Sequence, residues 1–173
     1  SYQTRNPYRQ FADAYASELD VFCYFEHAFA ADLCPRGGKV LDICCGRGLL
    51  IPMLHYRANP SLYVGVDIVP SNCKWKDGFD PRRETQRNTW KFPTRFIESN
   101  SAEMEEKLKA SGLADFDLLV FTSSIEHMQP MAQQQTLKEA ANIARKGSIL
   151  YLTCPITPKG KEGFDTQYAA HIY

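Results

Sequence analysis

The chain has 173 residues, enough for one ordinary domain around a single core and too few for two large ones. Hydrophobic residues make up 44% and charged residues 23%, a mixture typical of folded proteins and not of disordered chains. Twenty Lys and Arg balance twenty Asp and Glu, so no net field draws the molecule to nucleic acid or an anionic membrane. With apolar runs too short to span a bilayer and no charged-then-apolar leader, the sequence predicts a cytoplasmic protein without a membrane partner.

The first third of the chain predicts a helix, or two, from Pro7 to about Leu33. Large apolar residues recur there every three or four positions, with no Gly and no internal Pro, which gives the helix an aromatic face. The residues that form this face are Phe11, Tyr15, Leu19, Phe22, Phe25 and Phe29. We expect most of the aromatic residues Tyr8, Phe11, Tyr15 and Phe22 to pack on the sheet.

Five apolar runs then alternate with segments of helical spacing. The runs are KVLDICC (39–45), SLYVGVDIV (61–69), RFIES (95–99), FDLLVFTSS (116–124) and SILYLTC (148–154). This alternation requires crossover connections, and it predicts an α/β fold: a single-domain, Rossmann-like, doubly wound and mainly parallel sheet of at least five strands with helices on both faces. In such sheets ligands bind beyond the carboxyl ends of the strands.

The segment 70–93 breaks the alternation. It carries six Lys and Arg against three Asp and Glu, with Trp75, Phe79, Trp90 and Phe92 interleaved. Such a basic, aromatic insertion could bind an anionic or nucleobase-bearing substrate, although a solvated excursion is the commoner meaning of a charge run.

The junction of the first strand and the next helix carries the strongest chemical signal. Asp42 is followed by Cys44-Cys45 and then by Gly46-Arg47-Gly48, where the glycines let the backbone approach a ligand at the start of a helix. Asp67 ends the second run and comes beside this loop, where it can accept both hydroxyls of a ribose. The two carboxylates therefore predict a nucleoside site between neighbouring strand ends.

Details of this junction separate the cofactor classes. The phosphate-binding pattern G-x-x-x-x-G-K-[ST] is absent, and no third small residue follows Gly48, as a dinucleotide site would require. Asp42 would repel a pyrophosphate but suits a ligand with an ammonium or sulfonium charge. The six cysteines form no C-x-x-C pair, so we expect reduced, mostly buried thiols and no metal.

These residues resemble the class I S-adenosylmethionine-dependent methyltransferases, whose first motif reads approximately V-L-D-x-G-C-G-x-G. The resemblance covers residues 37–155 and implies S-adenosylmethionine as cofactor and S-adenosylhomocysteine as product. It implies that Asp42 and the 44–48 loop border the methionine moiety, and that Asp67 holds the ribose. The cofactor-contacting residues implied are Asp42, Cys44, Cys45, Gly46, Gly48, Asp67, Ile68, Asn100, Ser101, Ala102 and Ser123.

The same resemblance places the loop Ser123 to His127 beneath the sulfonium. Glu126-His127 looks like the E-H pair common after the fourth strand in methyltransferases of small molecules, and these two residues are the candidate catalytic pair. His127 could act as a general base, or the pair could only fix the loop, because methyl transfer to a nucleophilic atom needs mainly positioning. Residues 1–36 would form a helical lid from which Tyr15 faces the substrate.

Two departures from the family pattern carry structural expectations. Cys44 replaces the first glycine of the loop, so its backbone must adopt either a conformation open to any L-residue or a costly positive φ. The family sheet has two more strands after the fifth, but few residues follow Pro155. Either the chain given is trimmed, or the fifth strand is an edge that needs cover.

The functional prediction is methyl transfer from S-adenosylmethionine to an O, N or C nucleophile of a small molecule, by one domain spanning residues 1–173. A nucleic-acid or nucleotide methyltransferase using the 70–93 insertion is one alternative, but SSIE replaces the Asp/Asn-Pro-Pro-aromatic tetrapeptide of DNA amino-methyltransferases. A non-catalytic S-adenosylmethionine-binding module is the other alternative. The sequence predicts neither the acceptor nor the oligomeric state.

Overall fold

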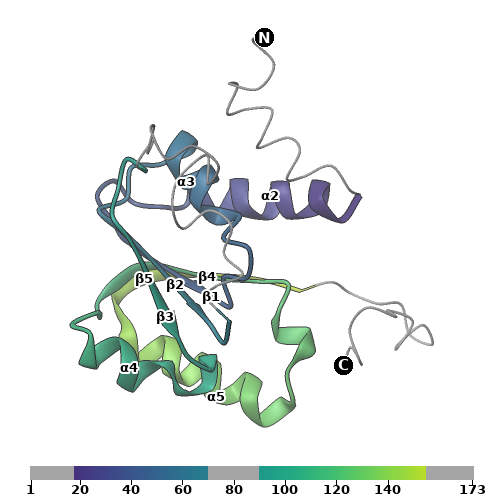
Figure 1. The fold of residues 1–173 in the computed structure, drawn as a ribbon, viewed down its shortest axis with the longest axis vertical. Coiled ribbons are helices and arrows are strands. Elements are labelled where there is room, and N and C mark those ends of the chain that lie inside the picture. Colours follow the sequence, from purple (N-terminus) through teal and green to yellow (C-terminus); the bar gives the residue numbers. More distant parts are fainter. Residues whose placement is uncertain (1–17, 70–89, 155–173) are drawn as a thin grey trace.

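The computed structural model describes residues 18–69 and 90–154, which form a parallel sheet flanked by helices (Figure 1). The five strands lie in the order β3-β2-β1-β4-β5, and every neighbouring pair is parallel. The strands are β1 Lys39–Ile43, β2 Leu62–Asp67, β3 Thr94–Glu98, β4 Phe116–Thr122 and β5 Ala144–Thr153. The helices are α2 Glu18–Asp32, α3 Leu50–Arg57, α4 Met104–Ala110 and α5 Pro130–Ile143, with short 3-10 turns η3 Ser101–Glu103 and η4 Ile125–His127. The predicted fold class is confirmed.

Helices cover both faces of the sheet, as the alternation of the sequence predicted. Figure 1 shows α2 and α3 on one face and α4 and α5 on the other. Each face has its own buried cluster, and the central strands β1 and β4 contribute side chains to both. Consecutive side chains of a strand point to opposite faces, so strands buried on both sides require the nearly continuous apolar runs that the sequence contains.

The buried face of α2 differs from the prediction. Ala28, Ala30 and Ala31 are buried against the sheet and α3, whereas Phe25 and Phe29 are 55% and 62% exposed. The small alanine side chains let α2 approach its neighbours closely, and this leaves the aromatic residues outside. Phe25 and Phe29 of the predicted aromatic face are thus not buried, while Tyr8, Phe11 and Tyr15 lie outside the described residues.

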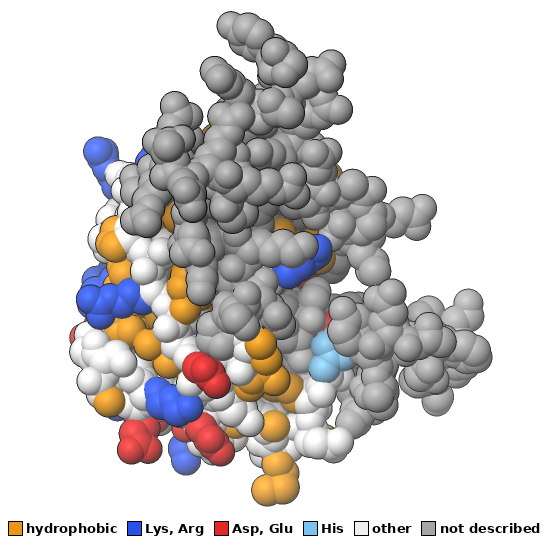
Figure 2. Space-filling view, in the orientation of Figure 1, with side chains coloured by type: hydrophobic (Ala, Val, Ile, Leu, Met, Phe, Trp, Pro, Cys, Tyr) orange, Lys and Arg blue, Asp and Glu red, His pale blue; other side chains and the backbone are white. Residues whose placement is uncertain are grey.

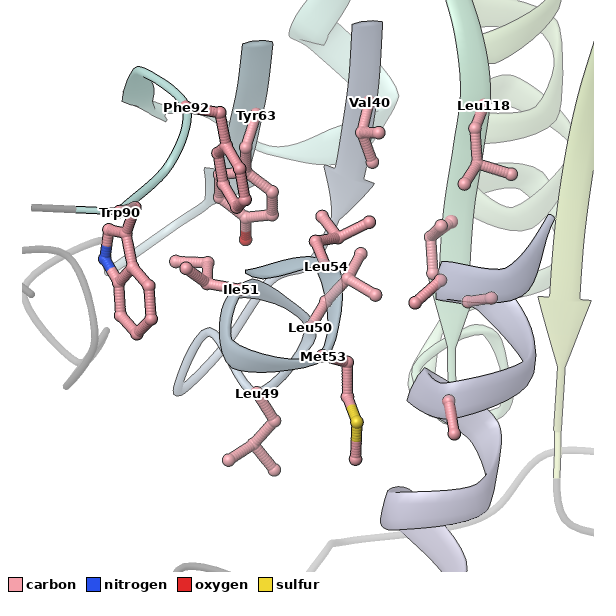
Figure 3. Close-up of a cluster of buried hydrophobic side chains, with 14 residues drawn as sticks. Val40, Leu49, Leu50, Ile51, Met53, Leu54, Tyr63, Trp90, Phe92 and Leu118 are labelled. Carbon is pink, nitrogen blue, oxygen red and sulfur yellow. The ribbon is translucent and has the colours of Figure 1, made fainter. Parts of the chain in front are cut away.

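The end of the 70–93 insertion belongs to the core. Trp90 and Phe92 are 7% and 4% exposed and pack with Tyr63 and Ile51 in the cluster on the α3 side of the sheet (Figure 3). The Trp90 ring lies edge-on to His55, with centroids 5.4 Å apart. Trp90 is therefore not available to stack on a substrate base, and residues 70–89 lie outside the described part of the chain.

Within the described residues β5 forms one edge of the sheet and β3 the other. The pairing of β5 with β4 is irregular between Phe116 and Leu118, and Gly147 in this stretch has φ +87°. Regular pairing begins at Ile149, and Ile149, Leu150 and Leu152 are each more than a third exposed. The residues after β5 lie outside the described part of the chain, so the expectation of an edge strand stays a prediction.

The surface seen in Figure 2 mixes charged and hydrophobic side chains, and charged groups gather over α4. None of the helices in the described parts of the chain combines the length and the apolar character that crossing a bilayer requires.

Candidate functional site

Asp67 joins the carboxyl ends of β1 and β2. Its Oδ2 accepts a 2.9 Å hydrogen bond from the backbone N–H of Gly46, and its Oδ1 accepts one of 2.9 Å from Val69. The first bond ties the β1–α3 loop to the end of β2. Because each carboxylate oxygen has two lone pairs and Asp67 is only half-buried, it retains capacity to accept the hydroxyls of a ribose.

The 44–48 loop turns through three residues of positive φ. Cys44 has φ 58°, Gly46 48° and Gly48 75°, so Cys44 adopts the costly conformation where the family has glycine. The loop is fixed by hydrogen bonds from Cys45 N to Val66 O (3.0 Å) and from Gly48 N to Cys45 O (2.8 Å). Backbone strain of this kind persists only where the surroundings determine it, and it concentrates at functional sites.

Asp42 lies beneath the loop. Its carboxylate is 3% exposed and accepts a 2.7 Å hydrogen bond from the Tyr63 hydroxyl. Burial raises the pKa of Asp42 to about 7, with the nearby Asp67 acting in the same direction and the Tyr63 hydrogen bond opposing both. The expected contact of Asp42 with a positive charge of the ligand therefore stays a prediction, since the structure gives this carboxylate almost no exposed surface.

The residues predicted beside the adenine stabilise the turn after β3. Asn100 Oδ1 accepts a 3.0 Å hydrogen bond from Ala102 N and caps η3, and the buried Ser101 hydroxyl is 2.9 Å from Thr136 Oγ1 of α5. In contrast, Ile68 is 67% exposed directly after Asp67. An exposed apolar side chain next to the ribose-binding candidate fits the flat face of a nucleobase.

Cys44 also contacts this turn through a hydrogen bond with Ser101. Burial raises the pKa of the Cys44 thiol to about 12, partly opposed by this bond, so the thiol is protonated at neutral pH. None of the five described cysteines is in a disulfide, but only Cys45 is fully buried and Cys154 is exposed. The expectation of mostly buried thiols was therefore too strong.

The loop after β4 contains the candidate catalytic pair. Ser123 has φ 45°, and Ser124 Oγ donates a 2.9 Å hydrogen bond to Thr122 O. Glu126 is buried, its Oε1 lies 3.8 Å from His127 Nε2, and the His127 side chain is 31% exposed. The pair thus consists of a buried acid beside a partly accessible imidazole.

Two residues of α2 that the sequence prediction missed reach this loop. Glu26 is 4% exposed, and its Oε1 accepts hydrogen bonds from the hydroxyls of Ser123 (2.9 Å) and Thr153. His27 Nε2 lies 3.4 Å from Thr122 Oγ1, and burial lowers the pKa of His27 to about 4, so its ring is neutral at pH 7. The available signal was a Glu-His pair inside an otherwise apolar helical stretch, YFEHAFAA.

The predicted site residues within the described ranges lie at or just after the carboxyl ends of β1 to β4, and thus along one edge of the sheet. Tyr15 lies outside the described residues. In residues 18–69 and 90–154 no group of three or more His, Cys, Asp or Glu side chains is arranged to hold a metal ion.

The fold and the position of this site define a Rossmann-like methyltransferase fold, and solved structures share it. They include an S-adenosylmethionine-dependent methyltransferase from Archaeoglobus fulgidus (TM-score 0.54, 18% identity, 84% of this chain and 57% of that one). A TehB-like S-adenosylmethionine-dependent methyltransferase from Corynebacterium glutamicum has a TM-score of 0.54 and 18% identity, and the match covers 84% of this chain and 72% of that one. The sugar N-methyltransferase KedS8 from Streptoalloteichus sp. has a TM-score of 0.55 and 14% identity, and the match covers 88% of this chain and 55% of that one. The chain thus spans little more than half of two of these proteins.

A family described as "Methyltransferase domain" matches residues 15–168. The chain belongs to this methyltransferase family, which confirms the family resemblance seen in the sequence. No curated protein sequence is significantly similar to the chain.

Proposed function

We propose that the protein transfers a methyl group from S-adenosylmethionine to an oxygen, nitrogen or carbon of a small-molecule acceptor, with S-adenosylhomocysteine as the second product. Family membership supports methyl transfer. The observation that carries the assignment of the site is the Asp67 carboxylate, which bridges Gly46 and Val69 where β1 and β2 end. Ligands of open parallel sheets bind at this edge.

The residues present fit the cofactor. Asp67 would accept hydrogen bonds from the ribose, the exposed Ile68 would contact the base, and the 44–48 loop would border the amino-acid moiety. When bound, S-adenosylmethionine supplies a methyl group already activated by its sulfonium charge. What remains for the protein is to orient the acceptor in line and to exclude water.

Glu126 and His127 have two possible roles. The 31% exposure of the His127 side chain gives it access to an acceptor, as a general base requires. The burial of Glu126 within the loop after β4 suits a positioning role instead. A His127→Ala variant that lowers kcat with little change in KM supports the first role, and a change in cofactor affinity alone supports the second.

Two observations favour a small molecule over a nucleic acid as acceptor. The net charge of the chain is zero, and Trp90 of the basic insertion is buried in the core rather than presented for stacking. One structural neighbour is described as a sugar N-methyltransferase and another as an O-methyltransferase family protein, which supports acceptors with nitrogen or oxygen nucleophiles.

A thermal-shift comparison tests the cofactor class. S-adenosylhomocysteine should raise the melting temperature, whereas NAD and ATP at equal concentration should not, because a ligand stabilises the native state that binds it. Stabilisation by NAD alone would overturn the proposal. Methyl transfer from labelled S-adenosylmethionine to a panel of amines, alcohols and short oligonucleotides then separates the acceptor classes, and cofactor binding without any turnover would favour a non-catalytic module.

A further inference from the structure

Glu26 is a buried carboxylate that reaches the site from outside the sheet. It projects from α2 to the carboxyl ends of β4 and β5, where Ser123 and Thr153 both donate their hydroxyl hydrogens to the same oxygen, Oε1. These bonds fix the carboxyl group between two strand ends. One strand end, at Ser123, begins the loop that is predicted to lie beneath the sulfonium.

The other oxygen of Glu26 is not satisfied in this way. Oε2 is buried and accepts no hydrogen bond from any residue in the ranges 18–69 and 90–154. Glu139, a buried carboxylate of α5, differs in this respect, because both of its oxygens accept hydrogen bonds. A buried acceptor without a donor is costly, so Glu26 Oε2 indicates a donor that arrives with a ligand.

The surroundings of Glu26 restrict what that ligand group can be. Its neighbour His27 is neutral at pH 7, and the charge of Glu26 raises the pKa of the Tyr151 hydroxyl on β5, after burial as the larger cause. A carboxylate accepts hydrogen bonds and donates none, and it repels an anion. An amine or a hydroxyl fits this position, whereas a phosphate or a carboxylate does not.

We infer that Glu26 binds the amine or hydroxyl group of the methyl acceptor, holding it at the loop after β4 through Oε2. This inference rests on the proposed function and deepens it, because it restricts the acceptor to molecules that present a hydrogen-bond donor at the reacting end. Ser123 and Thr153 act as positioning residues, since their hydroxyls orient the carboxylate without needing to touch the acceptor.

Two cofactor analogues test the inference without knowledge of the acceptor. Sinefungin carries an amine-bearing carbon in place of the methylsulfonium, so it presents a charged donor on the acceptor side of the cofactor, whereas S-adenosylhomocysteine presents none. In the Glu26→Gln variant the amide oxygen can still accept from Ser123 and Thr153, but the charge is lost. Isothermal titration calorimetry should show sinefungin affinity reduced about tenfold or more and S-adenosylhomocysteine affinity changed less than about threefold.

Glu139→Gln is the matched control, because it makes the same change at a buried carboxylate of α5 on the opposite face of the sheet. It should leave both affinities within about twofold of the native values. Equal losses for both ligands in Glu26→Gln would overturn the inference, since they would mean that Glu26 acts only on the cofactor loop; unchanged affinities would overturn it as well.

Measurements on the native protein keep the inference testable if Glu26→Gln does not fold. Sinefungin should bind about tenfold more tightly than S-adenosylhomocysteine, and equal or weaker binding would count against a carboxylate at this position. Acceptors found by turnover should be amines or alcohols, and methylation of carboxylic or phosphoric acids alone would overturn the inference. If neither analogue binds the native protein, the proposed function itself fails.

Discussion

The Tyr63 hydroxyl on β2 donates a 2.7 Å hydrogen bond to Asp42 Oδ2 on the adjacent β1, which leads into the 44–48 loop. Both side chains are buried, and burial raises the pKa of Asp42 to about 7. The pKa of His27, which lies beside Thr122 at the end of β4, shifts in the other direction, to about 4, because burial disfavours the charged form of its ring. One site thus contains two buried groups with opposite pH dependences.

These shifts predict the pH dependence of stability. Between about pH 4 and 7 the folded protein retains the Asp42 proton that the unfolded chain has lost, so this group lowers the free energy of unfolding as pH rises. Between about pH 4 and 6.5 the unfolded chain holds a His27 proton that the folded protein lacks, so His27 raises that free energy as pH rises.

Asp42→Asn should therefore give a protein whose stability increases more steeply with pH than that of the native protein, and His27→Gln should have the opposite effect. Urea unfolding followed by circular dichroism from about pH 4.5 to 7.5 measures both slopes. Superimposable pH profiles for the native protein and both variants would contradict the assigned shifts.

Asp67→Ala should weaken binding of S-adenosylhomocysteine roughly 10- to 100-fold, because it removes a charged acceptor for the ribose and frees the Gly46 and Val69 amides. Calorimetry on the folded variant measures the loss. Asp32→Ala is the control, since Asp32 pairs with Arg57 on the exposed surface and should not affect affinity. Unchanged affinity in Asp67→Ala would refute the ribose assignment.

Cys44→Gly should be more stable than Cys44→Ala by about 1 kcal/mol, because glycine adopts the φ of 58° without steric cost. Both variants remove the thiol, so their difference isolates the backbone. The same pair of substitutions at Ser111, where φ is −89°, should not favour glycine. Urea midpoints decide the order, and equal stabilities at position 44 would argue against a strained loop.

Gly65 lies in the middle of β2, where a Cβ would come within 2.8 Å of Cys45 Sγ and 3.1 Å of the Phe96 ring. Gly65→Ala should destabilise the protein by about 1–3 kcal/mol through overpacking. Removing the sulfur in a Cys45→Ala/Gly65→Ala double variant should recover about 1 kcal/mol relative to the sum of the single changes. If the effects of the two single changes on the free energy of unfolding simply add, the contact with Cys45 is not the cause of the destabilisation by Gly65→Ala.

Much of the fold could be predicted because the central strands are buried on both faces. Residues 118–121 of β4 must then be apolar at consecutive positions, and this pattern is readable in the sequence. The position of Asp67 at the end of β2 could be predicted for a related reason: a carboxylate that ends such a run lies at the edge where open parallel sheets bind ligands.

The packing of α2 could not be predicted from hydrophobicity alone. Phenylalanine at helical spacing indicates a buried face, but the approach of α2 to its neighbours selects the small residues Ala28, Ala30 and Ala31 instead. The role of Glu26 was not predicted for a similar reason, because its partners Ser123 and Thr153 lie 97 and 127 positions away in the sequence and only the fold brings them together. Asp42 was correctly placed on its strand, but its burial under Tyr63 depends on a neighbouring strand.

The long sequence separation between Glu26 and its two hydroxyl partners also affects the order in which the domain forms during synthesis. Thr153 lies 127 positions after Glu26, so the ribosome has synthesised nearly all of the described residues before the Glu26 carboxylate can accept hydrogen bonds from both hydroxyls. The helix that carries Glu26 emerges early, with a polar pair that has no native partners yet. We therefore expect the proposed acceptor-binding end of the site to be among the last parts of the domain to form during translation, after the proposed nucleoside-binding end between β1 and β2.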